Sequence, residues 1–579
     1  MARPYFPAIV LLLATTISLL TRAESKLASD EAASPTASIH CGEVKGTMEE
    51  GAAVFKGIPY GKAPTDERRW KPSSLLDTAD GSCWNGTWDA AEYGSECMQM
   101  NGGPVGSEDC LFINVITYNL QTPASASSTQ RTVPGSSSSS SNVTTGLLPV
   151  LVWIHGGGEM SGSGGDAGYT PTPVFARNTG VVAVSLNYRL NVFGFLSLDV
   201  LNEGNGSGNY GFYDQILGLS WVQQNIEAFG GDKSQVTILG QSGGGTSVVA
   251  ILSSPLANGL FHRAVVMSAS TTINATMEEA NKDNQVFLTG TGCSTAACLR
   301  NTSAETLMYL IPFNVYPYWN GGDAWDLPTY GVIVGKILVV DGVLIPEPSL
   351  DVIAQGKVND VPIVIGSAGQ ENDIAPPVNV RYYSWKQYDD YVQQHMNTFK
   401  KDPAINGTNV YRAVSQLYPH DMATPDTGGT CVTGTPEYLL TSMTSDIRIT
   451  CPTHLLAQFY AAHFKSDVYN YAVVQCPSVG AQEGGARYAY HTWGLYALFN
   501  FTFPADPRWQ PDTHDWQLVT VMQAWFSRFA RGQPPHPDWK TAEHGTFNLL
   551  YKPVMRDVYH KAQCDFFNQH DFIPYRWQN

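Results

Sequence analysis

The stretch VTILGQSGGG, residues 236–245, decides the fold, because it has the pattern of a buried strand that turns sharply into a helix. Residues 240–244 form a GxSxG motif around Ser242, and residues 246–252 have a helical pattern. A turn this sharp strains the backbone of its central residue, and side chains on either flank would clash with the strand and the helix. The stretch therefore predicts a nucleophilic Ser242 between a strand and a helix.

A second glycine-rich turn lies upstream, in the stretch WIHGGG at residues 153–158. It ends an apolar run, so its bare backbone N–H groups can approach a substrate oxygen. An HGGG pattern upstream of a GxSxG motif is far more specific than either pattern alone. We therefore predict an oxyanion hole formed by the N–H groups of Gly157, Gly158 and Gly243, the last of which begins the predicted helix.

The rest of the chain alternates between apolar runs and helical patterns. The best helical pattern spans Phe212–Phe229 and ends at two glycines. The apolar runs are Leu111–Thr117, Leu148–His155, Val181–Tyr188, Val236–Leu239, Ala264–Met267, Val361–Gly366 and Val468–Val474. Near-continuous apolar runs are typical of parallel strands that are buried on both faces. The sequence thus predicts an α/β fold, with a large, mostly parallel central sheet flanked by helices on both faces.

The sequence predicts a single domain, residues 24–579, which follows an N-terminal leader segment. Residues 1–23 combine a positive Arg3, an apolar run over Ala8–Leu20 and small residues near the end. This is the pattern of a secretory signal peptide, with a membrane anchor as the alternative. Residues 121–147 are rich in Ser, Thr and Pro and predict a flexible insertion. We favour a surface loop over a domain linker, because the apolar runs on either side look like neighbouring strands of one sheet.

Composition excludes several classes of function. The 579-residue chain has 34 Lys and Arg against 51 Asp and Glu, for a formal net charge of −17. This balance argues against a nucleic-acid partner and against a polybasic membrane-surface protein, because both need clustered basic residues. The sequence has no CxxC pair and no HExxH motif, so we expect no metal site. Ten cysteines and seven Asn-x-Ser/Thr sequons agree with a secreted, disulfide-bonded glycoprotein.

Further motifs give the chain a family likeness. They are GIPY at 57–60, EDCLFINV at 108–115, NYRL at 187–190, GF at 194–195, DQ at 214–215, NI at 225–226, FGGD at 229–232 and VTI at 236–238. With them the chain resembles the type B carboxylesterases, which include the cholinesterases, from about Gly42 to the C-terminus. The resemblance implies an α/β-hydrolase fold, a triad in the order Ser, Glu, His, and no cofactor.

The acid of this triad is expected after the apolar run that begins at Val361. The segment VPIVIGSAGQE at 361–371 resembles the strand, glycine and loop that carry the family's glutamate, which makes Glu371 the acid. Asp373 is the alternative. Ser268 resembles a family serine that hydrogen-bonds the acid, and an ordinary serine at a strand end is the other interpretation.

The base is expected on a loop in the last third of the chain. His491, in the segment YHTWG at 490–494, resembles the histidine at the family's position. On the residues alone, His463 and His560 also remain open as the base. The resemblance therefore implies that His491 takes the proton of Ser242.

The resemblance also implies disulfides. It pairs Cys97 with Cys110, Cys293 with Cys298 and Cys451 with Cys564, and closeness in the sequence adds Cys41 with Cys83 and Cys431 with Cys476. In cholinesterases the first of these loops is longer and carries the tryptophan that holds choline, and in fungal lipases it forms a lid. Here Met98–Asp109 contains no aromatic residue, so we expect neither a cation–π seat nor a large lid in this loop.

Four positions bear on the substrate. Gln241 stands where the family usually has a glutamate that favours cationic substrates, and its neutral amide weakens that preference. Glu159 stands where the family usually has a bulky apolar residue. Val332 and Val334 align with the phenylalanine pair that narrows the acyl pocket of acetylcholinesterase, so we expect a roomier pocket.

Three functions are compatible with these features. The first is a secreted carboxylesterase, monomeric or homodimeric, that acts on small neutral esters without nucleic-acid partners or stable membrane insertion. The second is a lipase or sterol esterase, which the short first loop disfavours. The third is a non-catalytic adhesion or interaction protein with a cholinesterase-like fold. Because the whole triad and the oxyanion glycines can be assigned, we favour an enzyme.

Overall fold

The computed structural model describes most of the chain. The described residues are 34–120, 146–204, 206, 208–313, 315–316, 325–332, 337–376, 378–401, 409–422, 430–478, 486–500, 511–570 and 572–577. The expected signal peptide, residues 1–23, and residues 121–145 of the expected insertion lie outside this set. None of the helices formed by the described residues has the length and apolar character needed to span a membrane.

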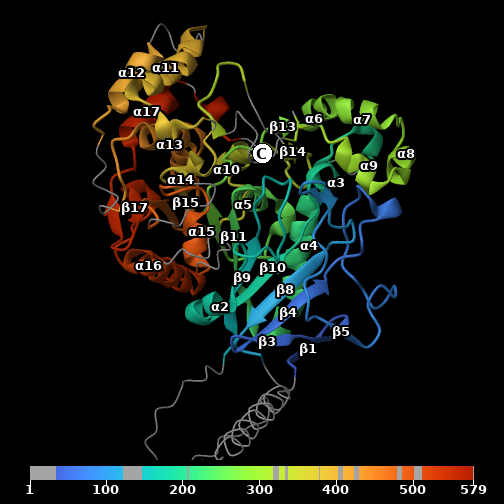
Figure 1. The fold of residues 1–579 in the computed structure, drawn as a ribbon. Helices are drawn as coiled ribbons and strands as arrows, with labels where there is room; N and C mark the ends of the chain where they lie inside the picture. Colours follow the sequence, from blue (N-terminus) through green and yellow to red (C-terminus); the bar gives the residue numbers. More distant parts are fainter. Residues whose placement is uncertain are drawn as a thin grey trace, which may run out of the picture.

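An eleven-stranded sheet forms the centre of the molecule (Figure 1). Its order is β18 (Val554–Arg556), β17 (Thr546–Leu549), β16 (Val468–Val473), β15 (Ile363–Ala368), β12 (Arg263–Met267), β11 (Gly231–Gln241), β9 (Leu148–Ile154), β10 (Val182–Leu186), β8 (Phe112–Thr117), β4 (Ala52–Pro59) and β3 (Thr47–Glu49). The strands from β17 to β10 are parallel to their neighbours, while β18, β8, β4 and β3 pair antiparallel at the two edges. The predicted mostly parallel sheet is confirmed.

Helices cover both faces of this sheet, as the alternation of strand side chains requires. In β9, Val150, Val152 and Ile154 pack with α4 (Tyr210–Asn225), α5 (Gly243–Ser253) and α14 (Cys451–His463). The side chains between them, Leu151 and Trp153, pack on the other face with α2 (Pro173–Thr179), α15 (Trp493–Leu498) and α16 (Thr513–Ala530). Burial on both faces explains why the central strands have continuous apolar runs.

One expected strand neighbour is wrong. The runs on either side of the Ser-rich insertion, β8 and β9, belong to one sheet, but β10 lies between them. β10 pairs antiparallel with β8 and parallel with β9. The connection from β9 through α2 is a parallel crossover, which returns the chain beside β9 and so places β10 in the gap. The helix predicted over Phe212–Phe229 is α4, followed by a 3₁₀ turn over Ile226–Phe229.

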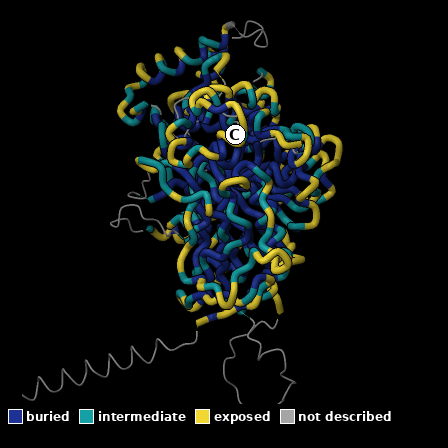
Figure 2. Tube along the Cα trace, turned by 90° about the vertical axis from the view of Figure 1, so that its right-hand side faces the viewer, coloured by how far each residue is buried: buried dark blue, intermediate teal, exposed yellow. Residues whose placement is uncertain are grey.

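The remaining elements surround this core. They are β1 (Thr36–Ile39), β2 (Gly42–Lys45), β5 (Thr87–Asp89), β6 (Gln99–Met100), β7 (Pro104–Val105), α3 (Asn191–Phe195), β13 (Ala275–Thr276), α6 (Met277–Asp283), α7 (Gln285–Thr291), α8 (Ala296–Asn301), α9 (Ala304–Tyr309), β14 (Val339–Val340), α10 (Ser349–Ala354), α11 (Trp385–Met396), α12 (Val410–Leu417), α13 (Pro436–Ser445) and α17 (Lys561–Gln569). In Figure 1, helices α6–α9 and helices α11–α13 stand on opposite sides of the marked C-terminus. Buried residues fill the middle of the molecule, and exposed residues lie mainly at its outline (Figure 2).

The structure contains five disulfides, and their pairing is the expected one. They join Cys41 to Cys83, Cys97 to Cys110, Cys293 to Cys298, Cys431 to Cys476 and Cys451 to Cys564. Within the described ranges no cysteine is free. The bridge from Cys451 to Cys564 connects α14 to α17, so it fixes the C-terminal helix to the sheet-covering layer.

Candidate active site

Ser242 lies at the tip of the turn between β11 and α5. Its φ of 59° and ψ of −128° are strained for a residue with a side chain. The flanking glycines allow the turn, because a Cβ on Gly240 would lie 2.0 Å from the carbonyl oxygen of Gly244. The N–H of Ser242 donates to the carbonyl oxygen of Met267 at the end of β12 (2.9 Å). Ser242 is only partly buried.

Glu371 lies just beyond β15 and is fully buried. One carboxyl oxygen, Oε2, lies 2.5 Å from Nδ1 of His491. The other, Oε1, accepts hydrogen bonds from the Ser268 hydroxyl (2.6 Å) and from the N–H of Ala368 (2.6 Å). The structure thus brings together the predicted acid, the predicted base and the serine predicted beside the acid.

Asp373, the alternative acid, is hydrogen-bonded to a different segment of the chain. Its Oδ2 accepts hydrogen bonds from the N–H groups of Arg487 (2.5 Å) and Tyr488 (2.9 Å). Burial raises the pKa of this carboxyl to about 6, although the two N–H donors lower it. Asp373 therefore holds the loop that leads to His491, and it does not contact the imidazole.

His491 lies just before α15, and the neighbour of the nucleophile holds its backbone. The side-chain amide of Gln241 donates to the carbonyl oxygen of His491 (3.0 Å). The edges of Trp325 and Trp577 meet the imidazole ring at centroid distances of 5.3 Å and 5.0 Å. Its Nε2 atom is buried and has no hydrogen-bond partner in the described part of the chain. This nitrogen is therefore available to take a proton.

The two alternative bases do not meet Glu371. His560 pairs through Nδ1 with Asp446 (2.8 Å), and Nδ1 of His463 lies 2.8 Å from the carbonyl oxygen of Phe459 in its own helix. The sequence gives no sign that Trp325 and Trp577 are neighbours of His491. Neither lies in a motif, and only the folded chain brings them to His491.

The glycine-rich turn packs directly on the nucleophile. A Cβ on Gly156 would lie 2.7 Å from the carbonyl oxygen of Gln241 and 3.0 Å from the Cβ of Ser242. Gly157 and Gly158 have φ values of 106° and 60°, which other residues rarely adopt. Gly243 is the first residue of α5, where backbone N–H groups and the helix dipole favour negative charge. The three predicted oxyanion donors thus belong to two turns in van der Waals contact.

The predicted pocket residues have different surroundings. Glu159 is fully buried, and both its carboxyl oxygens would lie 2.9 Å from a Cβ on Gly243. Val332 has an exposed fraction of 37%, and its N–H donates to the carbonyl oxygen of Thr329 (3.0 Å). Val334 lies outside the described residues. The structure describes no cluster of three or more metal-ligating side chains within these ranges.

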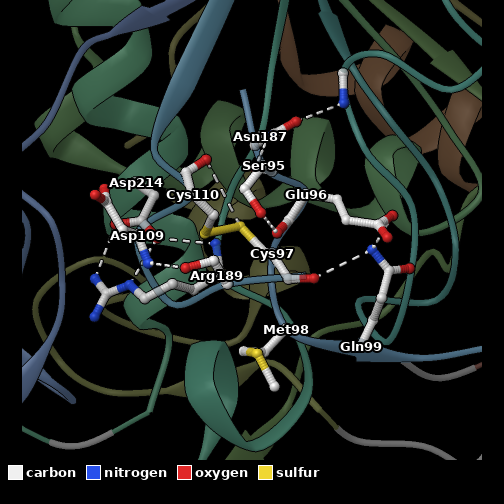
Figure 3. Close-up of a disulfide and its surroundings, with 12 residues drawn as sticks. Ser95, Glu96, Cys97, Met98, Gln99, Asp109, Cys110, Asn187, Arg189 and Asp214 are labelled. Carbon is white, nitrogen blue, oxygen red and sulfur yellow. Dashed lines mark hydrogen bonds and ion pairs between the residues drawn. A yellow bond between two sulfur atoms is a disulfide. The ribbon is translucent and has the colours of Figure 1, made fainter. Parts of the chain in front are cut away.

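The disulfide between Cys97 and Cys110 closes a small loop that braces this region (Figure 3). The carbonyl oxygen of Met98 accepts a hydrogen bond from the side-chain amide of Asn191 (2.7 Å), and Gln99 Oε1 accepts one from the N–H of Gly162 (2.8 Å). The loop is therefore bonded to the segment that follows the oxyanion glycines. Whether this loop acts as a lid stays a prediction from the sequence, and the structure shows it bonded to Gly162 and Asn191.

Beside this loop, Figure 3 shows a buried ion pair that joins two of the sequence motifs. Arg189 of the NYRL segment binds Asp214 of the DQ segment through Nε and Nη2, each at 2.8 Å. The N–H of Arg189 also donates to Asp214 (3.0 Å). This pair anchors the segment that follows β10 to α4.

The chain is similar to one family of proteins and to several known proteins from different species. Residues 33–567 match the carboxylesterase family. The para-nitrobenzyl esterase of Bacillus subtilis is 34% identical over 343 residues, which are 57% of this chain and 61% of that protein. Carboxylesterase 1D of Rattus norvegicus is 33% identical over 347 residues, 55% of this chain and 54% of that protein. Neurotactin of Drosophila melanogaster is 30% identical over 429 residues, 71% of this chain and 44% of that protein.

Solved structures have the same fold. A PNB esterase superposes with a TM-score of 0.68 at 25% identity, covering 93% of this chain and 99% of the other. The carboxylesterase EST55 of Geobacillus stearothermophilus superposes with a TM-score of 0.67 at 26% identity, with the same coverage. The chain spans 44% to 61% of the length of the three curated relatives named above. With its sheet order, its strand–turn–helix serine and a family match over residues 33–567, the chain belongs to the carboxylesterase family.

Proposed function

We propose that the protein is a secreted serine hydrolase that cleaves carboxylic esters with Ser242, His491 and Glu371. The observation that carries the proposal is the pairing of His491 Nδ1 with the buried Glu371 carboxyl at 2.5 Å. That contact leaves Nε2 of the same ring without a partner among the described residues, on a segment bonded to Gln241 beside the nucleophile. A base fixed by an acid on one side and available on the other is what a serine nucleophile needs.

In the first half of the reaction, His491 Nε2 takes the proton of the Ser242 hydroxyl as Oγ attacks the ester carbonyl carbon. Glu371 orients the ring and stabilises its cationic form. The carbonyl π electrons move onto oxygen, and the N–H groups of Gly157, Gly158 and Gly243 stabilise the resulting negative charge. The tetrahedral intermediate collapses, His491 returns the proton to the alkoxide leaving group, and an acyl-enzyme remains.

In the second half, water replaces the alcohol. His491 takes a proton from water, whose oxygen attacks the acyl carbon of the intermediate. Collapse of the second tetrahedral intermediate releases the carboxylic acid and returns the proton to Ser242. All atoms come from the ester, water and the protein, so the cycle needs no cofactor.

The substrates we propose are small, neutral esters. Gln241 is neutral and uses its amide to hold the His491 backbone, so this position adds no negative field for a cationic alcohol. The loop closed by Cys97 and Cys110 has no aromatic residue for cation–π contact and is bonded to the wall of the site. These features favour a small-ester hydrolase over a choline esterase or a lid-dependent lipase.

We further propose that the protein works outside the cell as a glycoprotein. Five disulfides suit an oxidising compartment, and the expected signal peptide directs the chain there. Three of the sequon asparagines, Asn85, Asn274 and Asn301, are exposed and accessible to glycosylation. Intact mass before and after glycosidase treatment of the secreted protein tests this part of the proposal.

The test of the enzyme proposal is hydrolysis of p-nitrophenyl acetate, butyrate and palmitate by the secreted protein and by Ser242→Ala. We expect turnover of the short esters and a loss of about 10⁴-fold or more in kcat for the variant. A preference for palmitate would identify a lipase or sterol esterase instead. Folded protein that shows no turnover above Ser242→Ala, and that an organophosphate does not label, would contradict the enzyme proposal.

A non-catalytic role is the second candidate. One relative, 30% identical over 429 residues, is named neurotactin, a name that does not refer to an esterase. The candidate requires that the assigned triad be inactive, so the same Ser242→Ala comparison separates it from the esterase.

A further inference from the structure

Glu159 occupies an unusual position for a glutamate, directly after the oxyanion glycines. Its side chain has an exposed fraction of 0%, and neither carboxyl oxygen has a hydrogen-bond partner in the described part of the chain. Its φ of 58° is in the left-handed region. The N–H of Asn191 fixes this backbone by donating to the Glu159 carbonyl oxygen (2.7 Å). The same Asn191 binds the disulfide loop through Met98, so the strained conformation is held from two sides.

The carboxyl group of Glu159 packs against the first residue of α5. Both oxygens would lie 2.9 Å from a Cβ on Gly243, so the carboxyl occupies the space that an alanine side chain would need. Gly243 is also the residue whose N–H we assign to the oxyanion hole. A charge on Glu159 would therefore act directly on the donor group that must stabilise the transition state.

Among the described residues, the side chains near this carboxyl supply no compensating positive charge. Just after β10, the Tyr188 hydroxyl donates to the carbonyl oxygen of His155 (2.7 Å). Burial raises the pKa of this hydroxyl, and proximity to Glu159 adds to the rise. From the end of β9, the His155 ring stacks on Tyr188 (4.3 Å), and burial lowers its pKa, which keeps it neutral. From the start of α3, Asn191 is neutral. From the loop after β10, Arg189 is paired with Asp214.

Burial without a partner disfavours the charged form of a carboxyl group. It raises the pKa of Glu159 to about 8. The side chain is thus neutral at pH 7 and takes on charge in mildly alkaline solution.

We propose that Glu159 is a positioning residue that supports catalysis only in its neutral form, and that loss of its proton disables the oxyanion hole. This inference rests on the proposed function. The ionised carboxylate and the oxyanion carry like charges beside the same N–H donor. Like charges a few ångströms apart in a protein interior raise the energy of the transition state enough to slow the reaction about tenfold to a hundredfold. The activity of the enzyme therefore falls at alkaline pH because Glu159 loses its proton.

The first experiment compares kcat/KM between pH 5 and pH 10 for the secreted protein and for Glu159→Gln. An aliphatic ester such as ethyl butyrate is used, because its alcohol does not ionise in this range. We expect the ratio of kcat/KM at pH 9.5 to that at pH 7 to be about 0.1 or less for the unmodified protein and near 1 for Glu159→Gln.

Tyr188→Phe is the matched control, because it removes the other titratable hydroxyl beside the carboxyl. It should keep the alkaline limb. A flat alkaline profile in the unmodified protein, an unchanged limb in Glu159→Gln, or loss of the limb in Tyr188→Phe would each overturn the proposal.

A second measurement needs no turnover. Infrared difference spectra of Ser242→Ala between pH 6 and pH 9.5 should show loss of a protonated carboxyl band with a midpoint near pH 8. The band should be missing from Ser242→Ala combined with Glu159→Gln. Its absence from Ser242→Ala itself would overturn the neutral Glu159. Failure of the esterase assay alone would instead contradict the proposed function, so the two failures are distinguishable.

Discussion

Two glutamates of the same site, Glu371 and Glu159, are equally buried and have opposite surroundings. Each has an exposed fraction of 0%. Glu371 has three polar contacts, with His491, Ser268 and the N–H of Ala368. Glu159 has none among the described residues and packs on the backbone of Gly243. Burial alone therefore does not decide what a carboxyl group does, because the donors that surround it decide whether it can carry charge.

The difference has a structural origin. Glu371 follows a parallel strand, where N–H groups and hydroxyls from the ends of β12 and β15 converge on one point. Glu159 follows a glycine turn whose own N–H groups are directed to the substrate in the proposed mechanism. One carboxyl is thus placed to stabilise a cation, and the other is placed where an anion would compete with the reaction.

The strongest test of this contrast makes the same change, Glu to Gln, at both positions. Glu371→Gln replaces the carboxylate that orients His491 with an amide, and we expect kcat to fall about 10⁴-fold. Glu159→Gln keeps a neutral group in place, and its main effect is on the alkaline limb. Steady-state kinetics at pH 7 and pH 9.5 measure both effects. Equal losses of kcat at the two positions would contradict the contrast.

A third buried carboxyl, Asp214, tests how much a charged partner contributes to the free energy of unfolding. Arg189→Met removes the guanidinium and leaves the buried charge of Asp214 uncompensated. We expect the free energy of unfolding to fall by about 3–5 kcal/mol. Urea denaturation followed by fluorescence measures this loss.

The control is the double variant Arg189→Met, Asp214→Leu. It removes the orphaned charge together with its partner and should recover most of the stability. A double variant as unstable as the single one would show that packing, rather than charge, dominates here.

The cost of burying Glu159 should appear in the pH dependence of stability. The pKa of this carboxyl is about 8 in the folded protein, above the ordinary value of 4.5. The folded state therefore binds the proton more tightly than the unfolded state, and stability falls as pH rises from about 4.5 to about 8. Compared with Glu159→Gln, the unmodified protein should lose a few kcal/mol over this range.

Urea midpoints of the two proteins at pH 5, 6.5 and 8 measure this loss. A constant difference between Glu159→Gln and the unmodified protein at all three pH values would contradict the assignment.

The smallest effect concerns a single donor to Glu371. Ser268→Ala removes one hydrogen bond to the carboxylate and leaves the other two contacts. A hydrogen bond to a charged group is worth about 1.5–3 kcal/mol, so we expect kcat to fall about tenfold or somewhat more. Ser270→Ala is the matched control, since its buried hydroxyl has no partner among the described residues. Equal kcat values for the two variants would show that Ser268 has no role in orienting the acid.

Much of the fold could be predicted because the determining patterns are local. Six of the predicted apolar runs form strands that are buried on both faces, and such burial requires apolar residues at nearly every position. These strands are β9, β10, β11, β12, β15 and β16. The place of β10 between β8 and β9 could not be predicted in this way. Strand order depends on how each crossover returns to the sheet, and composition carries no record of it.

In the candidate site, too, some residues could be predicted from local sequence patterns and others could not. Ser242 and the oxyanion glycines lie in short motifs whose residue types are required by backbone geometry, so they could be found directly. The partners of His491 could not, because Trp325 and Trp577 reach the ring only through the tertiary fold. Glu159 was visible as a departure from the family pattern. Its isolation from donors depends on residues that follow β9 and β10 and on the first residues of α3 and α5, and these converge only in three dimensions.

The bridge between Cys97 and Cys110 has a practical consequence for producing the protein. It closes the loop that is bonded to Gly162 and Asn191, and Asn191 in turn holds the Glu159 backbone. In a host compartment that keeps thiols reduced, this brace and the other four disulfides would be lost, whereas no strand of the central sheet contains a cysteine. Protein recovered from such a host should look folded by circular dichroism and yet have an ill-ordered catalytic turn, so a spectroscopic quality check would pass a batch that an activity assay rejects.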